Sequence, residues 1–344
     1  MILLVGALHA VPDLKNKNRL PGWAAYLFTF KSATFPLKIR YLSIMINNLN
    51  TPTTTETQQK ANRTIGFLLI SLSYITALVI GLIVFNNTGG TIWMNLFLAD
   101  LAATFVIWVS SLLLNNASVY DPYWSVQPIV ILPLLMLHVG EITMTSFLLC
   151  VVVILWGVRL TLNWVSTFKG LHEQDWRYDQ IKHQTGTFYP LVNLLGIQLM
   201  PTLIVFACIA PIVYVIYSSQ AFTWLILPGL LISLSGVFLE AVADRQMHDF
   251  RLKNPGRSVI IREGLWKYSR HPNYLGEIMM WWGAYLVCLA CSPSAWMLGL
   301  GALVNTALFL FISIPLAEKR LAKNKEGFLE YKQQTRMLLP FPKK

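Results

Sequence analysis

From about Thr64 onward, the chain alternates long apolar stretches with short polar segments. Several stretches approach the ~20 residues that a helix needs to cross a bilayer. The pattern predicts spans at Ile65–Phe85, Trp93–Leu114, Tyr123–Val139, Ile142–Trp164, Pro190–Tyr217, Phe222–Ala243, Glu277–Ala290 and Ala295–Leu316. Two of these stretches are short, so we expect an all-α transmembrane bundle of seven or eight spans. Pro201 and Pro211 predict kinks in the longest stretch.

The composition agrees with a polytopic membrane protein. The chain is 55% hydrophobic and only 12% charged, whereas soluble domains carry about 25% charged residues. All four cysteines lie in apolar stretches, and we interpret them as packing thiols rather than as a disulfide framework or a metal site.

The positions of the basic residues predict the sidedness of the spans. Lys and Arg are absent from the loops Asn86–Ile92, Gly140–Glu141, Ser218–Ala221 and Cys291–Ser294. From Lys60 onward they lie in the opposite loops and tails, and Arg159 lies near the matching end of its span. Basic residues mark cytosolic loops, so both termini are expected in the cytosol. This topology accounts for the net charge of +11 better than a nucleic-acid partner does.

The first 63 residues differ in composition from the rest. "MILLVGALHAV" is too short to span a bilayer, and "NNLNTPTTTETQQK" has the composition of a disordered segment. We expect residues 1–63 to be an N-terminal extension and residues 64–344 to form the transmembrane domain. The first forty-odd residues would be a targeting segment or an over-extended gene start, with Met45 as the true start.

The stretch "RHPNYLGE" places polar side chains at the mouth of an apolar helix. Pro272 suits the first turn of a helix. Arg270 and His271 would then lie beside free backbone N–H groups, which together favour a phosphate. The Asn273 amide suits a base or amide edge. A belt of snorkelling basic residues would explain Arg270 but not His, Asn and Glu277 together.

A second group lies in "EAVADRQMHDFRLKNPG". Glu240, Asp244 and Arg251 fall close to one face of a helix, and "NPG" predicts the turn that ends it. Carboxylates that emerge from an apolar helix are costly unless they are paired or functional. A salt-bridged helix end is the alternative to a site.

Three further places carry candidate chemistry. In "HEQDWRYDQ", an ion pair of Asp175 with Arg177 or Lys182 is as reasonable as a ligand contact, and the spacing does not favour a metal. In "NNASVYDPYWS", Asp121 and Tyr123 suit a hydrogen bond to a substrate carbonyl, and an interfacial aromatic belt is the alternative.

Asp100 lies within a span, where carboxylates are functional candidates unless the interface solvates them. The basic tail, with Leu321 and Phe328 among lysines, predicts an amphipathic surface helix. Its residues Arg320 and Tyr331 could close over an anionic ligand, although attraction to lipid headgroups explains most of the tail's charge. No Rossmann or P-loop glycine motif is present in the sequence.

These motifs together resemble the steroid 5-alpha-reductase superfamily, and most closely an uncharacterised multi-span branch that shares its C-terminal domain. The resemblance covers roughly Gln127 to the C-terminus. It lies in Asp244 followed by Arg251, in "GLWKYSRHPNYLGE", in "WWGAYL" and in the basic tail ending "LLPF"; "DPYWS" and "DWRY" also fit. It implies a multi-span helical oxidoreductase of CH-CH groups. Such an enzyme binds NADPH at the cytosolic side and reduces an activated C=C bond in a sterol-like or long-chain lipid.

The resemblance implies cofactor contacts at Asp244, Arg251, Arg270, His271, Asn273, Glu277 and, more loosely, Arg320, to which we add Glu240 and Tyr274. A hydrogen-bond donor must polarise the substrate carbonyl while hydride is delivered. We expect Tyr123, oriented by Asp121, with Asp100 second. The Gln-Glu motif of the reductases is not evident here, so a steroid substrate is not implied.

Two alternatives stay open at this point. The isoprenylcysteine carboxyl methyltransferases, which use S-adenosylmethionine, share RHPxYxG, and Glu318 and Tyr331 fit their tail. The other alternative is a non-catalytic lipid-binding membrane protein. In a eukaryotic cell, the endoplasmic reticulum is the expected membrane.

Overall fold

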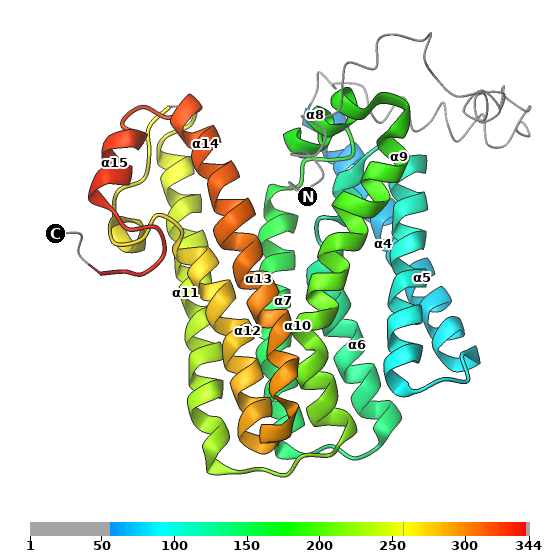
Figure 1. Cartoon of the computed structure of the whole chain (residues 1–344). Coiled ribbons are helices and arrows are strands. Elements are labelled where there is room, and N and C mark those ends of the chain that lie inside the picture. Colours follow the sequence, from blue (N-terminus) through cyan, green and yellow to red (C-terminus); the bar gives the residue numbers. More distant parts are fainter. Residues whose placement is uncertain (1–55, 257, 342–344) are drawn as a thin grey trace, which may run out of the picture. The chain divides into compact units, whose positions relative to one another are not determined.

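The computed structural model describes residues 56–256 and 258–341, which are mostly helical and contain no strands (Figure 1). Eight of its helical segments are long and apolar enough to cross a membrane. The predicted all-α bundle and its eight spans are therefore confirmed. The described residues form two units, which comprise residues 56–121 with 168–200 (unit 1) and residues 122–167 with 201–341 (unit 2).

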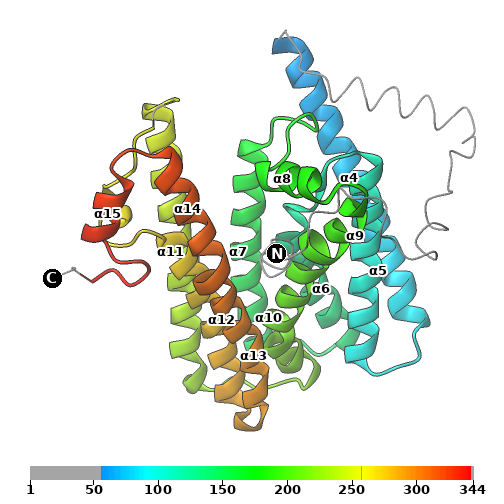
Figure 2. The ribbon, with the colours of Figure 1, turned by 45° about the horizontal axis from the view of Figure 1, so that its top comes forward.

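Unit 1 is built on two long antiparallel helices, which lie side by side in Figures 1 and 2. Its helices are α4 (Glu56–Asn87), α5 (Ile92–Leu113), α8 (Trp176–Thr185), α9 (Tyr189–Val192) and the π-helix η4 (Asn193–Leu199). The Trp108 indole on α5 donates to the Pro190 carbonyl, at 2.9 Å. This bond joins α5 to the segment that carries α9 and η4.

Unit 2 contains α6 (Tyr123–Val139), α7 (Met144–Thr167), α10 (Met200–Tyr217), α11 (Leu227–Lys253), α12 (Pro272–Cys291), α13 (Leu300–Leu308), the π-helix η8 (Phe309–Ser313), α14 (Ile314–Asn324) and α15 (Phe328–Gln334). Its central feature is the close pair α11 and α12, which run side by side in Figures 1 and 2. Ser233 on α11 donates to the carbonyl of Met280 on α12, at 2.8 Å.

Proline explains where the long helices change their winding. The π-helices η4 and η8 each lie just before a proline, Pro201 and Pro315 respectively. Proline has no N–H for the carbonyl four residues earlier, and π-turns are one way in which a helix accommodates such a defect. A π-helix thus precedes Pro201, and the kinks expected at Pro201 and Pro211 stay a prediction.

The apolar span predicted at Glu277–Ala290 is the later part of a longer helix. The helix α12 begins at Pro272, where the sequence predicted a helix start, and is 20 residues long. At the N-terminal side, the structure describes α4 from Glu56, so residues 56–63 are helical. The expected division of the chain at residue 63 stays a prediction. Met45 and the expected targeting segment lie outside the described residues.

The α11–α12 contact depends on glycine at the crossing. A Cβ added to Gly236 would lie 2.5 Å from the carbonyl oxygen of Gly276 and 2.7 Å from the amide nitrogen of Met280. Small residues permit such close backbone approach in membrane bundles. We expect Gly236→Ala to force the helices apart and to lower the free energy of unfolding by about 1–3 kcal/mol. Thermal unfolding in detergent measures this, and Gly89→Ala, whose Cβ meets nothing within 4 Å, is the control. Equal melting temperatures for the two variants would contradict it.

Candidate functional site

A buried ion-pair cluster joins α7 to α11 in unit 2. Arg159 on α7 donates a hydrogen bond to Asp244 and forms an ion pair with Glu240, in which Nη2 lies 2.9 Å from Oε2. Asn163, one turn after Arg159, also reaches the Asp244 carboxylate, at 3.4 Å. Glu240 and Asp244 are one turn apart on α11 and face the same guanidinium. The carboxylates that were expected to be paired or functional are therefore paired, and their partner is an arginine on another helix.

Glu277 on α12 is held by two tryptophans. The Trp156 indole donates to its Oε2 at 2.8 Å, and the Trp281 indole donates to its Oε1 at 2.7 Å. Both indoles are almost completely buried, and their ring centroids lie 4.9 Å apart. Glu277 also lies within electrostatic range of Glu240 and Asp244. We call Arg159, Glu240, Asp244 and Glu277 the carboxylate cluster.

The carboxylate cluster favours ligand groups that donate hydrogen bonds over anionic groups. It holds three carboxyl groups and one guanidinium, which contacts two of them, Glu240 and Asp244. Each of the four residues lies on a helix long and apolar enough to span a membrane. Burying such charges is costly and marks a functional candidate. Oε2 of Glu240 is occupied by the ion pair with Nη2 of Arg159, whereas Nε of Arg159 is buried without a hydrogen-bond partner. One donor of the guanidinium is therefore available to a polar ligand.

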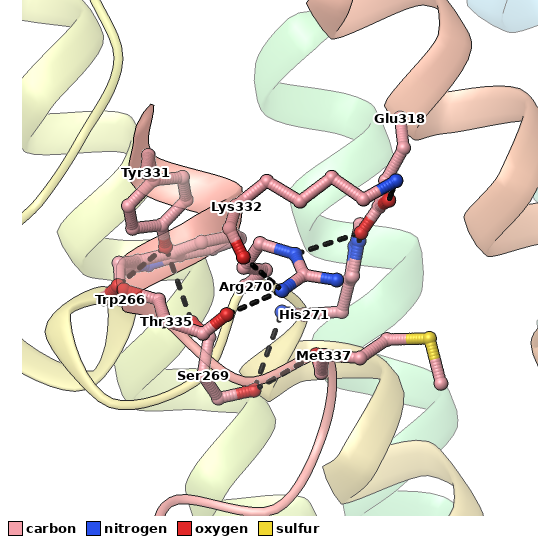
Figure 3. Close-up of polar contacts among 9 residues, drawn as sticks. All are labelled: Trp266, Ser269, Arg270, His271, Glu318, Tyr331, Lys332, Thr335 and Met337. Atoms are coloured by element: carbon pink, nitrogen blue, oxygen red, sulfur yellow. Dashed lines mark hydrogen bonds and ion pairs between the residues drawn. The ribbon is translucent and has the colours of Figure 1, made fainter. Parts of the chain in front are cut away.

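A second polar group ties the start of α12 to the C-terminal segment (Figure 3). The Arg270 guanidinium donates to Glu318 on α14, at 2.8 Å, and to the carbonyls of Lys332 and Thr335 at the end of α15. The Lys332 ammonium contacts the other oxygen of Glu318, at 2.8 Å. We call Arg270, His271, Glu318, Lys332 and Thr335 the tail clasp.

The residues expected to bind a phosphate at the start of α12 instead bind a carboxylate of the tail clasp. Pro272 is the first residue of α12, as predicted, and Arg270 and His271 precede it. The anion that they meet is Glu318, whose Oε1 lies 3.4 Å from Nε2 of His271. The Arg270 and Glu318 side chains are only 7% and 8% exposed. Arg270 therefore binds an internal carboxylate in this structure and is not displayed to a phosphate.

Tyr331 also belongs to the fastening of the tail. Its hydroxyl donates to the Trp266 carbonyl. Burial raises the pKa of Tyr331 to about 12, so the phenol stays protonated and keeps this bond at physiological pH. The sequence predicted a residue that closes over a ligand, whereas the structure uses the side chain to bind the backbone before α12.

The remaining predicted cofactor residues lie around the same end of unit 2. Arg251 is exposed in the last turn of α11, and Arg320 is exposed on α14. Asn273 is half-buried in the first turn of α12. The Tyr274 ring stacks on His271, with centroids 5.3 Å apart. Phe309 lies against the same Tyr274 ring at 4.7 Å.

The predicted donor pair is arranged differently. Asp121 in unit 1 accepts a hydrogen bond from the Tyr178 hydroxyl, at 2.7 Å, so the phenol that it holds is not the predicted Tyr123. The loop before α8 brings Tyr178 there, since Asp175 caps that helix. Tyr123 is buried in unit 2 as the first residue of α6.

The structure also shows the surroundings of the other polar residues predicted in unit 1. Asp175 binds the Arg177 guanidinium through both carboxylate oxygens, at 2.9 and 2.8 Å, which confirms that ion pair. Lys182 instead donates to Asn115, at 2.6 Å. Asp100 is 4% exposed and lies eight residues into α5, about 12 Å along its axis. It is therefore inside the helix bundle rather than at the interface.

Sequence reasoning missed Arg159 and the two tryptophans as site residues. Arg159 carried a usable signal, because it is a cation within an apolar stretch, where ionisable residues are rare and functional. Trp156 and Trp281 carried no such signal, because a tryptophan in an apolar helix is equally typical of ordinary packing.

Trp156 offers a direct test of how Glu277 is held. Trp156→Phe keeps an aromatic ring but removes the indole donor, so one buried oxygen of Glu277 loses its hydrogen bond. We expect the free energy of unfolding to fall by about 1–3 kcal/mol. Thermal unfolding in detergent measures the loss. Trp296→Phe, at a 65% exposed position, is the control, and a Trp156→Phe melting temperature equal to its value would refute the assignment.

Comparison with known proteins agrees with the sequence and the fold. A family described as "Protein of unknown function (DUF1295)" matches residues 107–335. A protein named steroid 5-alpha-reductase DET2 from Gossypium hirsutum is 36% identical over 66 residues, which cover 19% of this chain and 26% of the relative. The Arabidopsis thaliana protein of the same name is 29% identical over 121 residues, covering 35% of this chain and 43% of the relative.

This chain thus spans less than half the length of these curated relatives. No solved structure matches it. The family match covers well over half of the chain and includes both the carboxylate cluster and the tail clasp. The chain therefore belongs to the DUF1295 family, and its predicted resemblance to the steroid 5-alpha-reductase superfamily is confirmed.

Proposed function

We propose that this protein is a membrane-embedded reductase that uses NADPH to reduce an activated C=C bond in a sterol-like or long-chain lipid. The observation that carries the proposal is the carboxylate cluster, which places Arg159, Glu240, Asp244 and Glu277 inside membrane-spanning helices. The names of the two curated relatives support a reductase. In a eukaryotic cell we place it in the endoplasmic reticulum, with both termini in the cytosol.

The residues at this end of unit 2 fit the parts of a dinucleotide unequally. The exposed guanidiniums of Arg251 and Arg320 suit phosphates. The half-buried Asn273 amide suits a base or carboxamide edge. The Glu240 carboxylate, which the Arg159 guanidinium holds in place, suits a ribose hydroxyl or an amide N–H. Arg270 and His271 would hold the tail in place instead of binding phosphate directly, because Glu318 already engages them.

NADPH would supply the hydride that adds to the β-carbon of an enone or enoyl group. The chain must then polarise the carbonyl with a hydrogen-bond donor as enolate charge develops. We retain Tyr123 as the proposed donor, because it is buried in unit 2. Asp121 and Asp100 both belong to unit 1, and Asp121 already accepts a hydrogen bond from the Tyr178 hydroxyl. Their participation stays a proposal.

Thermal stabilisation of the detergent-solubilised protein tests the cofactor. We expect NADPH to raise the melting temperature, by the equivalent of about 2.7 kcal/mol at one hundred times its dissociation constant, and S-adenosylmethionine to leave it unchanged. NADH in parallel reports the preference for the 2′-phosphate. Arg251→Ala and Asn273→Ala should weaken NADPH binding. Lys253→Ala removes an exposed charge two residues from Arg251 and serves as the matched control.

The outcomes separate the candidate functions. Stabilisation by S-adenosylmethionine alone would favour the methyltransferase. One observation supports that second candidate: Glu318 from the tail contacts Arg270 and His271 of the RHPxYxG stretch. A folded protein that neither compound stabilises would instead support a lipid-binding role. NADPH affinity unchanged in both Arg251→Ala and Asn273→Ala would reject the cofactor placement.

A further inference from the structure

Three buried polar side chains form a closed network within unit 1. Ser111 on α5 is 2% exposed, and Asn193 and Gln198 on the π-helix η4 are both 0% exposed. Nδ2 of Asn193 donates to Oγ of Ser111 at 3.0 Å. Nε2 of Gln198 donates to the same Oγ at 2.9 Å and to Oδ1 of Asn193 at 3.1 Å.

The network fixes which way the Gln198 amide points. The hydroxyl proton of Ser111 is donated to the Trp108 carbonyl, at 2.7 Å, so Oγ can only accept from the two amides. Both amides must therefore turn their NH₂ groups toward it. Gln198 then donates both of its protons within the network, and its Oε1 is buried without a hydrogen-bond partner.

The π-winding of η4 is what creates this arrangement. In a π-helix residues five apart are close, as Asn193 and Gln198 are. The structure thus places a buried acceptor without a hydrogen-bond partner on a short element of a candidate membrane span.

The position of the network along α5 and its unpaired acceptor limit the kinds of ligand that can bind there. Ser111 lies two residues before the end of α5, about 3 Å from it along the axis. Ser111 therefore lies near the end of a candidate span, and the ends of spans meet the interface, where lipid hydroxyls reside. A buried acceptor in such a place needs a donor. A ketone, an ester or an ether cannot meet it, because these groups only accept.

We propose that Oε1 of Gln198 binds the hydroxyl group of a lipid alcohol, such as a sterol or a long-chain alcohol. The site belongs to unit 1 alone, and the inference does not rest on the proposed reductase activity. It assigns a hydroxyl to the lipid ligand, in addition to any carbonyl that reduction would require.

Competition photolabelling of the full-length protein in nanodiscs tests the site. The probe is cholesterol carrying a ring diazirine, and labelled peptides containing residues 193–199 are quantified by mass spectrometry. The competitors are cholesterol and its 3-methyl ether, then hexadecanol and its methyl ether, which distinguish a sterol from a long-chain source. Each ether keeps the apolar body but removes the donor.

In the native protein, at least one alcohol should compete about tenfold better than its ether, the loss expected when a buried acceptor stays unpaired. Gln198→Leu should abolish that preference. Ser111→Ala should weaken it, because the freed amide is no longer held, and this milder variant serves if Gln198→Leu does not fold. Leu195→Ala, at a 41% exposed position of the same π-helix, should retain it.

Equal competition by alcohol and ether in the native protein would overturn the proposal and leave a water molecule as the partner of Oε1. An alcohol preference that survives in Gln198→Leu would overturn it as well. NADPH stabilisation, measured on the same variants, should be unchanged. Failure of the cofactor test and failure of the alcohol test are therefore separate results.

Discussion

Replacing Arg159 with methionine is expected to lower the free energy of unfolding by about 3–5 kcal/mol, the cost of leaving a buried charge without its partner. Glu240 and Asp244 both face this guanidinium, and their side chains are 3% and 20% exposed. Methionine fills a similar apolar volume, so the loss reports the charge rather than a cavity. Thermal unfolding in detergent, read by tryptophan fluorescence, measures it.

A compensating variant makes this prediction sharper. Adding Glu240→Gln and Asp244→Asn to Arg159→Met neutralises the stranded carboxylates, and it should recover most of the lost stability. Lys169→Met breaks an exposed pair with Glu173, whose side chains are 67% and 53% exposed, and should cost less than about 1 kcal/mol. If Arg159→Met costs no more than Lys169→Met, the guanidinium does not neutralise the carboxylate cluster.

Replacing Arg270 with alanine is expected to release the C-terminal segment and to destabilise the protein by about 3–5 kcal/mol. The substitution leaves Glu318 without a buried partner. It also removes donors from the carbonyls of Lys332 and Thr335, which lie at the unsatisfied end of α15. Amide hydrogen exchange should show lost protection across residues 328–337, while α7 and α12 exchange as before.

A lysine at position 270 is the control that separates charge from the shape of the guanidinium. Arg270→Lys keeps the charge but lacks the planar fork that reaches Glu318 and two carbonyls together, so it should restore the protection only in part. Arg320→Ala, at an exposed position on α14, should leave exchange at residues 328–337 unchanged. Full protection of that segment in Arg270→Ala would show that the tail is held by other contacts, such as the Tyr331 bond to Trp266.

The spans and the local helix signals were predictable because they depend on neighbouring residues. Backbone polar groups must be satisfied within a span, so apolar stretches of sufficient length become helices almost regardless of their partners. Pro272 at the first position of α12 and the turn at Asn254 and Gly256 followed from backbone geometry. Hydropathy alone placed the apolar span only from Glu277, because it does not detect a helix whose first turn is polar.

The pairing of the site residues was not predictable, because the partners are far apart along the chain. Arg159 and Asp244 are separated by 85 residues, and Trp156 and Glu277 by 121. A carboxylate at a helix end has the same local pattern whether it meets a cofactor, an arginine or two indoles. For the same reason, Asp121 was assigned to the nearby Tyr123, whereas α8 delivers Tyr178 from 57 residues away.

The sequence by itself therefore determined that this is a helical membrane protein with ionisable groups at one end of its spans, since hydropathy and charge act locally and along the chain. Only the tertiary structure decided what each ionisable group meets. It placed Glu318 against Arg270 and His271, Arg159 between Glu240 and Asp244, and Ser111 beside Gln198. Coulombic and hydrogen-bond energies depend on distance in space, and packing of the helices sets that distance.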